Sequence, residues 1–467
     1  MRIHNILSRY VLLPVGKTYS GRRYFKALKY QRYLEETQYW DDVRIDNLRN
    51  RLFQDLISHC FHNVPFYRDY MIRNNLRIED FKTYRDIIKF PLLTKKVINE
   101  NFNDLLAQNY NKRKIRYDAT GGTTGVPVNF ARDKKNEYRV DANNWRLWNF
   151  VGFKPWMKSA LFWGNESELL KSNTVKQKLK TMMENTKILN FFDLSEKRLR
   201  QYTEYMVKNK PEIIHGYASS VFLFVEYCKK HNITFAYKPK GVILTADKIP
   251  KHQKKEISDF FQCDVSEEYG CREFSILAHE CSHHRGLHLS EELFIFEVFD
   301  LNSKKCSFEG KGEIVVTPFF NYAMPLLRYC LGDEVTISSE ICSCGRKLKL
   351  LSNMEGRIAD YIITKSGKLI HGEFFAHLFY FCTGIGMYQI NQYEKGIIVI
   401  NIVKNKNFRE TEIVKFLADL KKMCKDDIEA SVEYVAKIKT PTSGKRRSVI
   451  SYIVSDYIKG GESYYKR

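Results

Sequence analysis

No run of apolar residues in this chain approaches the roughly 20 that a membrane-spanning helix requires. The opening stretch, MRIHNILSRYVLLPVGK, has a basic flank, but its apolar part is short and is broken by Pro14, so it does not read as a signal peptide. The eleven cysteines are an odd number and lack the regular spacing of a disulfide scaffold. We therefore expect a chain without a transmembrane segment that resides in a reducing cytoplasm.

The chain also lacks the motifs of several common enzyme classes. The stretch TGGTTGVP at 120–127 is not a Walker A loop, because Val126 and Pro127 follow its last glycine. The GIG at 384–386 has no third glycine and is not a dinucleotide fingerprint. The stretch HGYASS at 215–220 lacks the G-x-S-x-G turn of serine hydrolases, and no cysteine–histidine pair forms a recognisable nucleophile motif.

Positive charge is what the sequence has in excess, with 76 basic against 54 acidic residues and a net charge of +22. Such an excess favours anionic partners such as nucleotides, nucleic acids, acidic glycans or a membrane surface. The basic residues are spread along the chain, however, which also fits a composition that selects no partner. The lead segment 1–45 is a denser basic and aromatic segment, and it could contact a membrane peripherally or form a solvated helical face. No motif supports nucleic acid as a partner.

The order of expected elements predicts an α/β architecture. Hydrophobic residues make up 44% of the 467 residues, which is enough for two or more packed domains. A helical region is expected at about 45–110. Strand-like segments at 159–164, 212–217 and 241–247 are each followed by helix-like runs, which predicts some parallel sheet. From about 285 the strands follow one another directly, so we expect a β-rich region there.

A smaller unit is expected to begin near residue 357. It contains a hairpin with its turn at 394–396, the helical run TEIVKFLADLKKMC and the strand-like SVEYVAKI. We therefore predict an α/β protein with a large N-terminal domain at 1–356 and a small α+β C-terminal domain at 357–467. The large domain would combine mixed α/β sheets and helices with a β-rich subdomain.

The glycine–threonine loop at 120–127 carries the strongest chemical signal. Glycines let backbone N–H groups approach an anion closely, and threonine hydroxyls add donors to phosphate oxygens. A phosphate-binding loop is the functional interpretation, and a mobile Gly/Thr turn is the structural one.

This loop resembles the pyrophosphate loop of the adenylate-forming (AMP-binding) superfamily, [ST]-[SG]-G-[ST]-T-G-x-P. Four more stretches resemble motifs of that superfamily in the same order, across about residues 118–447: EYGCRE at 268–273, MPLLRYCLGD at 324–333, the hinge Gly356-Arg357, and TSGK at 442–445. HNVPFYRDY, HGYASS and CSCGRK are most like the phenylacetate–CoA ligase branch, in particular its capsular polysaccharide (CapK-type) relatives.

The resemblance implies an adenylate-forming ligase that uses ATP and Mg²⁺. A carboxylate would attack the α-phosphorus of ATP to give an acyl-AMP and pyrophosphate, and the acyl group would pass to a thiol or an amine. The implied partners are a small carboxylic acid and an acyl acceptor, in capsule or cell-surface polysaccharide biosynthesis. Coenzyme A is the usual acceptor of the family, but an amine on a sugar is equally compatible.

By the same resemblance, each motif has a role at the nucleotide. Lys445 would reach from the mobile C-terminal lid domain to the α-phosphate, and Glu273 would hold Mg²⁺. Asp333 would bind both ribose hydroxyls, because a carboxylate accepts two hydrogen bonds. The remaining ATP-binding residues would be Thr120, Gly121, Gly122, Thr123, Thr124 and Gly125 at the phosphates, Tyr269 and Gly270 near adenine, and Arg328 and Arg357 at phosphate or ribose oxygens.

The acid pocket and the hinge are less well specified. Trp163, Tyr217 and Asp247 are candidates for the pocket, and Asp247 stands where relatives usually carry a glutamate. At the hinge, Ala359 stands where an acidic residue is usual, which puts the domain rotation and the second half-reaction in question.

A structural zinc site is a separate prediction. Cys342 and Cys344 lie on a glycine turn, and CSHHRGLH at 281–288 offers another cysteine and three histidines. Three thiolates and one imidazole would complete a closed tetrahedral site. The resemblance favours Cys281, His288, Cys342 and Cys344, with His288 ahead of His284; free thiols with exposed histidines are the alternative.

A non-catalytic relative that binds nucleotide or acidic glycan within a polysaccharide assembly is the competing function. The retention of Lys445, Glu273 and Asp333 favours the enzyme.

Overall fold

The computed structural model describes residues 21–111, 114–119, 128–163, 185–191, 196–246, 249–300, 303, 305–355, 361–379, 382, 384–438 and 448–453.

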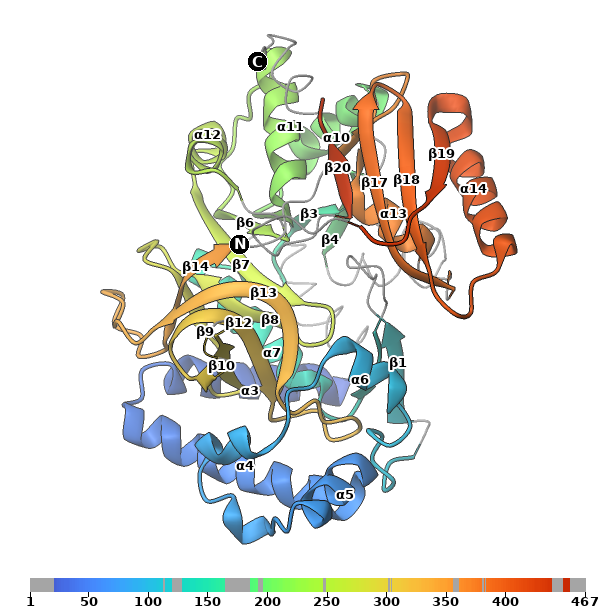
Figure 1. The fold of residues 1–467 in the computed structure, drawn as a ribbon. Helices are drawn as coiled ribbons and strands as arrows, with labels where there is room; N and C mark the ends of the chain where they lie inside the picture. The colour runs from blue at the N-terminus through green and yellow to red at the C-terminus, as the bar shows by residue number, and fades with distance from the viewer. Residues whose placement is uncertain are drawn as a thin grey trace.

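The N-terminal part is helical, as the apolar spacing predicts, and it lies under the large sheet in Figure 1. The α4 helix begins after Asp41, whose side chain accepts a hydrogen bond from the backbone N–H of Arg44. Its chain turns at Val64, and Pro65 opens the next helix, where a missing N–H costs nothing. These elements are α3 (Gly21–Thr37), α4 (Asp42–Asn63), α5 (Pro65–Arg73), α6 (Lys95–Glu100) and the short turns η2 (Ile78–Asp80) and η3 (Tyr84–Lys89).

One sheet of twelve strands organises the large domain, in the order β11-β10-β12-β13-β14-β9-β8-β7-β6-β5-β3-β4. Strands β4 to β7 are parallel, and every neighbouring pair from β7 to β11 is antiparallel. The predicted α/β region followed by a β-rich region is thus confirmed. The strands are β3 (Ser159–Trp163), β4 (Thr186–Asn190), β5 (Ile213–Tyr217), β6 (Gly241–Thr245), β7 (Asp264–Cys271), β8 (Ser275–Glu280), β9 (Leu287–Leu289), β10 (Phe294–Phe299), β11 (Cys306–Ser307), β12 (Gly310–Pro318), β13 (Tyr329–Ser338) and β14 (Leu350–Glu355).

Helices cover the two faces of the parallel strands differently. On one face, Ile214, Val242 and Leu244 are buried in a core with Phe224 of α11. This face is covered by α10 (Glu196–Asn209), α11 (Ala218–Lys230) and α12 (Lys251–Phe261). Toward the other face lie α7 (Glu137–Trp148) and η5 (Asn149–Val151), which contact β6, β7 and β8.

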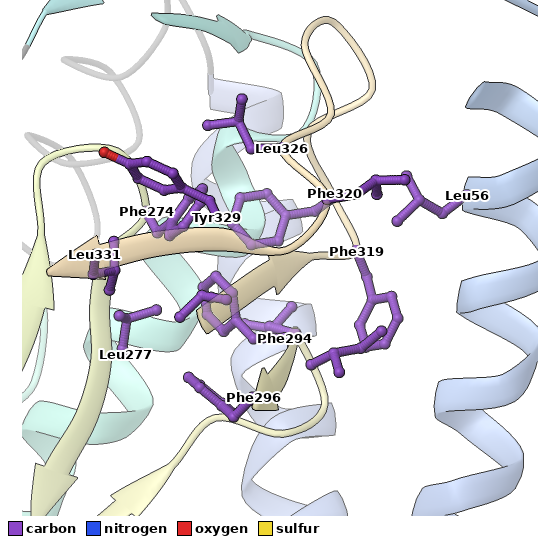
Figure 2. Packing of buried hydrophobic residues seen from close by; sticks show 14 of the residues in the cluster. Leu56, Phe274, Leu277, Phe294, Phe296, Phe319, Phe320, Leu326, Tyr329 and Leu331 are labelled. Carbon is purple, nitrogen blue, oxygen red and sulfur yellow. The ribbon is translucent and has the colours of Figure 1, made fainter. Parts of the chain in front are cut away.

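A second, larger core lies where the β-rich half meets the N-terminal helices, and Figure 2 shows its aromatic centre. The ring of Phe294 lies 5.4 Å from that of Phe320 and 6.0 Å from that of Phe274, and Phe274 lies 5.9 Å from Tyr329. Leu56 of α4 is buried in the same cluster. Ring separations of this size are favourable in edge-to-face contacts, so packing fixes the ring of Tyr329.

A small antiparallel hairpin stands apart from the large sheet. It consists of β1 (Ile115–Ala119) and β2 (Asn129–Asp133), and Ala119 pairs with Asn129. The hairpin therefore holds both ends of segment 120–127, which lies outside the described residues. Asn321 Nδ2 donates to the backbone oxygen of Ala131 at 2.8 Å, which ties β2 to the main core.

The C-terminal unit has a sheet and a core of its own. Its main sheet has the order β19-β18-β17-β20, and its core residues all lie between Ile362 and Val449. Gly396 forms the turn of the predicted hairpin with a φ of +77°, a conformation that favours glycine. The elements are β15 (Tyr361–Ile363), β16 (Leu369–His371), α13 (Gly372–Leu378), β17 (Ile385–Glu394), β18 (Ile397–Lys404), α14 (Glu410–Cys424), η7 (Lys425–Asp427), β19 (Glu429–Tyr434) and β20 (Val449–Ser451).

Among the described residues, every helix is too short or too polar to cross a membrane. All eleven cysteines are described, and all are free thiols.

Candidate active site and candidate metal centre

Several residues predicted for the site lie outside the described part of the chain. They are Lys445, Arg357, Asp247, and Thr120, Gly121, Gly122, Thr123, Thr124 and Gly125 of the loop. Ala359 of the hinge lies outside it as well.

Tyr269 and Asp333 meet across the sheet. Tyr269 lies on β7 and Asp333 on β13; three strands separate these two in the sheet order, but β13 curves strongly (Figure 1). The Tyr269 hydroxyl donates to Asp333 Oδ2 at 2.9 Å, and Tyr269 is only 8% exposed. A carboxylate accepts several hydrogen bonds, so this contact orients the group without exhausting it as an acceptor. Residues of two separate sequence motifs are thus in direct contact.

Gly270 has a structural reason to be glycine. A Cβ built at this position would lie 2.4 Å from the backbone oxygen of Ser275 on the neighbouring strand β8. A side chain would therefore push β7 and β8 apart. The close approach of the two strands accounts for this glycine of the motif without a contact to ATP.

Glu273 lies on the turn between β7 and β8, and a tyrosine holds it. The Tyr329 hydroxyl donates to Glu273 Oε1 at 2.7 Å; Tyr329 is fully buried and Glu273 is 9% exposed. A hydrogen bond to a charged group is among the stronger ones in proteins. Sequence reasoning missed Tyr329 as a site residue, although it stands inside the quoted stretch MPLLRYCLGD.

Arg328 is paired in the interior of this structure, and its predicted role at ATP stays a prediction. Its Nε and Nη2 donate to Glu297 at 2.8 to 3.1 Å, and its Nη1 donates to the backbone oxygens of Phe90 at 2.6 Å and Ile88 at 3.1 Å. Both side chains of the pair are buried, and burial raises the pKa of Glu297 although Arg328 opposes that shift. The planar guanidinium joins the β-rich half to the segment after η3.

An ion pair links the β1–β2 hairpin to the turn of Glu273. Arg272 Nη2 lies 3.2 Å from Asp118 Oδ1, and Asp118 directly precedes the last residue of β1. Arg132 of β2 lies 3.8 Å from the same carboxylate and donates to the backbone oxygen of Arg272. The ends of segment 120–127 are thereby fixed next to the predicted magnesium ligand.

The predicted pocket residues Trp163 and Tyr217 lie together. Their ring centroids are 4.4 Å apart, and they stand at the carboxyl ends of the neighbouring parallel strands β3 and β5. In open α/β sheets, ligands bind outside the carboxyl ends of the strands. The two rings therefore lie where a ligand is expected in such a sheet, and their role at the acid stays a prediction.

A buried histidine–carboxylate pair lies beside these rings. His215 Nε2 is 3.0 Å from Glu268 Oε1, and Trp148 Nε1 donates to Glu268 Oε2 at 2.8 Å. Burial favours a raised pKa for Glu268, but His215, His279 and Trp148 lower it below its ordinary value, so the group is ionised at neutral pH. His279 is itself neutral, because burial lowers its pKa to about 4. Sequence reasoning quoted both stretches but missed His215 and Glu268; alternation along β5 puts His215 on the face of Tyr217.

The four predicted zinc ligands form one cluster. Cys281, His288, Cys342 and Cys344 place their ligand atoms within 4.8 Å of one another. Cys281 Sγ lies 3.8 Å from Cys342 Sγ, and His288 Nε2 lies 3.4 Å from the sulfurs of Cys281 and Cys344. Zinc–sulfur bonds of about 2.3 Å in a tetrahedron separate two sulfurs by about 3.8 Å, so the spacing fits the metal.

The structure also decides between the candidate histidines. His284 Nε2 lies 2.9 Å from Asp264, and His284 is largely exposed, whereas His288 is fully buried in the cluster. Around the four ligands, Phe150 stacks edge-on against His288 at 5.8 Å, and the Arg346 guanidinium lies 3.9 Å over the Phe150 ring. The surroundings are closed, as in a structural site.

Comparisons with solved structures define the fold. The chain aligns with 2-hydroxyisobutyryl-CoA ligase in complex with 2-HIB-AMP and CoA in the thioesterification state, with a TM-score of 0.62, 16% identity, and 89% of this chain and 91% of that chain covered. The same ligase in the postadenylation state gives a TM-score of 0.57. The fold is that of the adenylate-forming ligases, which confirms the expected fold class.

Comparisons of sequence find similar proteins of two kinds. Residues 362–452 match the family model of the CapK C-terminal domain. Protein CapK of Staphylococcus aureus is 24% identical over 447 residues, covering 94% of this chain and 95% of the relative. Phenylacetate-coenzyme A ligase of Thermus thermophilus is 24% identical over 326 residues, covering 68% and 71%. The resemblance to CapK and the phenylacetate–CoA ligases within the adenylate-forming superfamily is confirmed.

Proposed function

We propose that this chain is an adenylate-forming ligase that activates a carboxylic acid with ATP, releases pyrophosphate and transfers the acyl group to a thiol or an amine. The observation that carries this proposal is the convergence of separate motifs. Tyr269 meets Asp333, Tyr329 holds Glu273, and Arg272 ties the phosphate-loop hairpin to the same turn.

The described residues have clear tasks in such a reaction. Asp333 would accept hydrogen bonds from the ribose hydroxyls while Tyr269 keeps its carboxylate in place. Tyr329 would keep Glu273 oriented toward Mg²⁺, which when bound would neutralise phosphate charge. Lys445, Arg357 and the loop 120–127 are proposed to hold the phosphates and the attacking carboxylate. Trp163 and Tyr217 are proposed to border the acid, together with Asp247.

The acceptor and the biological setting are finer parts of the proposal. Coenzyme A as the acceptor is supported by the similarity to phenylacetate-coenzyme A ligase. An amino sugar as the acceptor would suit capsule or cell-surface polysaccharide biosynthesis, which the likeness to CapK supports. A structural zinc bound by Cys281, His288, Cys342 and Cys344 is also proposed.

ATP–pyrophosphate exchange tests the proposed function. Purified protein should exchange labelled pyrophosphate into ATP only when a suitable carboxylic acid is added, in a panel with and without coenzyme A. Asp333→Ala should weaken ATP binding by about tenfold or more, because a lost hydrogen bond to a charged group costs about 1.5–3 kcal/mol. Calorimetric titration with ATP measures this change.

The control variant is Asp259→Ala, which removes an exposed carboxylate on α12. Equal ATP affinity of Asp333→Ala and the unchanged protein would contradict the ribose role. A protein that binds ATP but shows no pyrophosphate exchange, whichever acid of the panel is added, would point to the non-catalytic relative.

A further inference from the structure

We propose that His215, held by Glu268, is a specificity-determining residue of the acid pocket, and that the acid this chain activates carries a hydroxyl group. The inference rests on the proposed function and names the substrate class of the same site.

The pair is rigid. Both oxygens of Glu268 are bonded, one to His215 at 3.0 Å and the other to the indole N–H of Trp148 at 2.8 Å. The side chains of His215 and Glu268 are only 13% and 6% exposed. The imidazole ring also lies 5.2 Å from the ring of Trp148 and 6.1 Å from that of Trp163. A carboxylate and two indoles thus hold the imidazole in one orientation.

The pair faces the proposed pocket. His215 and Tyr217 are two residues apart on β5 and share one face, because side chains alternate along a strand. The opposite face of the strand carries the core that α10, α11 and α12 cover. His215 therefore belongs to the same wall as the aromatic pair Trp163 and Tyr217, near the carboxyl ends of the parallel strands.

The free ring nitrogen determines the chemistry. An ionised carboxylate only accepts, so Nε2 carries the proton that faces Glu268. Among the described residues, no hydrogen bond reaches Nδ1 of His215. A hydroxyl group fits this nitrogen in both states of the ring, since it donates to the neutral imidazole and accepts from the imidazolium. A plain alkyl or aryl acid that covered this nitrogen would leave a polar atom without a partner.

Matched pairs of acids test the inference with the unchanged protein. ATP–pyrophosphate exchange is measured with 4-hydroxyphenylacetate and phenylacetate, 3-hydroxybutyrate and butyrate, and lactate and propionate. At least one hydroxy acid should exceed its partner in kcat/KM by about 100-fold or more, because a site built for a hydroxyl rejects the analogue that lacks it. Equal or better use of the acids without the hydroxyl would overturn the inference and leave the proposed function standing.

Variants assign the preference to His215. In His215→Phe the preference should fall to about threefold or less, while exchange with the acid that lacks the hydroxyl persists. His215→Gln, which retains hydrogen-bonding groups, should keep part of the preference. The control His231→Phe alters an exposed histidine after α11 and should keep all of it. A His215→Phe protein with an undiminished preference for the hydroxy acid would overturn the role of His215. If the unchanged protein shows no pyrophosphate exchange with any acid, the proposed function itself is refuted.

Discussion

Neighbouring residues at the start of β13 have different tasks. Arg328 has a φ of +57°, in the left-handed region, and its guanidinium is paired with Glu297 in the interior. Tyr329, the next residue, points its hydroxyl at Glu273. The strained backbone at Arg328 thus lies where two successive side chains take different directions. The side chain of Arg328 is structural, and that of Tyr329 supports the candidate site.

Replacement of Tyr329 by phenylalanine tests the support of Glu273. Tyr329→Phe removes only the hydroxyl from a packed ring, so the fold should persist. We expect kcat for pyrophosphate exchange to fall about tenfold, because a hydrogen bond to a charged group contributes about 1.5–3 kcal/mol. The magnesium concentration needed for half-maximal activity should rise. The measurement is a magnesium titration of the exchange rate.

The matched control is Tyr393→Phe, which changes an exposed tyrosine of the C-terminal unit. If the magnesium dependence of Tyr329→Phe equals that of the control, Tyr329 does not position a metal ligand.

At the scale of elements, the β1–β2 hairpin depends on the turn between β7 and β8 for its position. Arg116 and Arg132 face each other across the hairpin, an unfavourable arrangement that the nearby carboxylates of Asp118 and Glu137 compensate. Arg272 extends this network to the turn of Glu273. The network therefore couples the loop that would hold the phosphates to the residue that would hold the metal.

Arg272→Ala should raise KM for ATP several-fold, about three- to tenfold, with little change in the free energy of unfolding. A partly exposed ion pair contributes only about 0–1 kcal/mol to stability. The double variant with Asp118→Asn should show less than the sum of the single effects, because the two residues act as one contact. Steady-state kinetics and a denaturant titration measure the two quantities.

Lys255→Ala is the control, since it breaks the exposed pair with Asp259 on α12. Additive effects of Arg272→Ala and Asp118→Asn would contradict the coupling.

The four candidate metal ligands also connect elements, because they lie in two connections of the large sheet and on one short strand. Cys281 follows β8, and Cys342 and Cys344 precede β14; His288 lies on the short strand β9 between them. Strand β9 pairs with β14 through only two residue pairs. A bound metal would therefore reinforce a part of the sheet that has a short ladder.

The unchanged protein should contain about one zinc per chain by elemental analysis, since three thiolates and one imidazole complete a tetrahedral site. Cys344→Ser should lose most of the metal and melt several degrees lower, by about 4 °C or more for a loss of a few kcal/mol. Cys263→Ser, which alters a free cysteine outside the cluster, is the control. A stable protein free of zinc after growth with zinc would refute the site.

At the scale of the whole molecule, the described residues between 362 and 449 have a core apart from those of the large sheet, and the proposed catalytic lysine falls in this stretch of the sequence. Binding of ATP by the large unit and catalysis that needs both units should therefore be separable.

Lys445→Ala should lower the rate of pyrophosphate exchange by about 100-fold or more, because it removes a charge that stabilises the transition state. ATP affinity by calorimetry should change far less. Lys437→Ala, at an exposed position of the same unit, serves as the control. An undiminished exchange rate would remove Lys445 from the reaction.

The predictability of this molecule from its sequence differed between elements and side chains. The parallel segment, the β-rich segment and the C-terminal hairpin were predicted, because periodicity is a local signal. The proximity of Cys281, His288, Cys342 and Cys344 was expected from the family resemblance, and the metal itself stays a prediction. The contacts of Arg328, Tyr329 and His215 were not predicted, because their partners, such as Glu297 and Glu273, are distant in the sequence. The direction of a side chain across a bent sheet has no local signal.

Strand β7 lies between the parallel and the antiparallel half of the sheet. It carries Glu268 and Tyr269 as successive residues. Since successive side chains point to opposite faces, one peptide bond separates the group proposed to serve the acid from the group proposed to serve the nucleotide. A shift of this strand along its axis would displace the contacts of both substrates at once. Binding of one substrate would then change the position of the residues that contact the other.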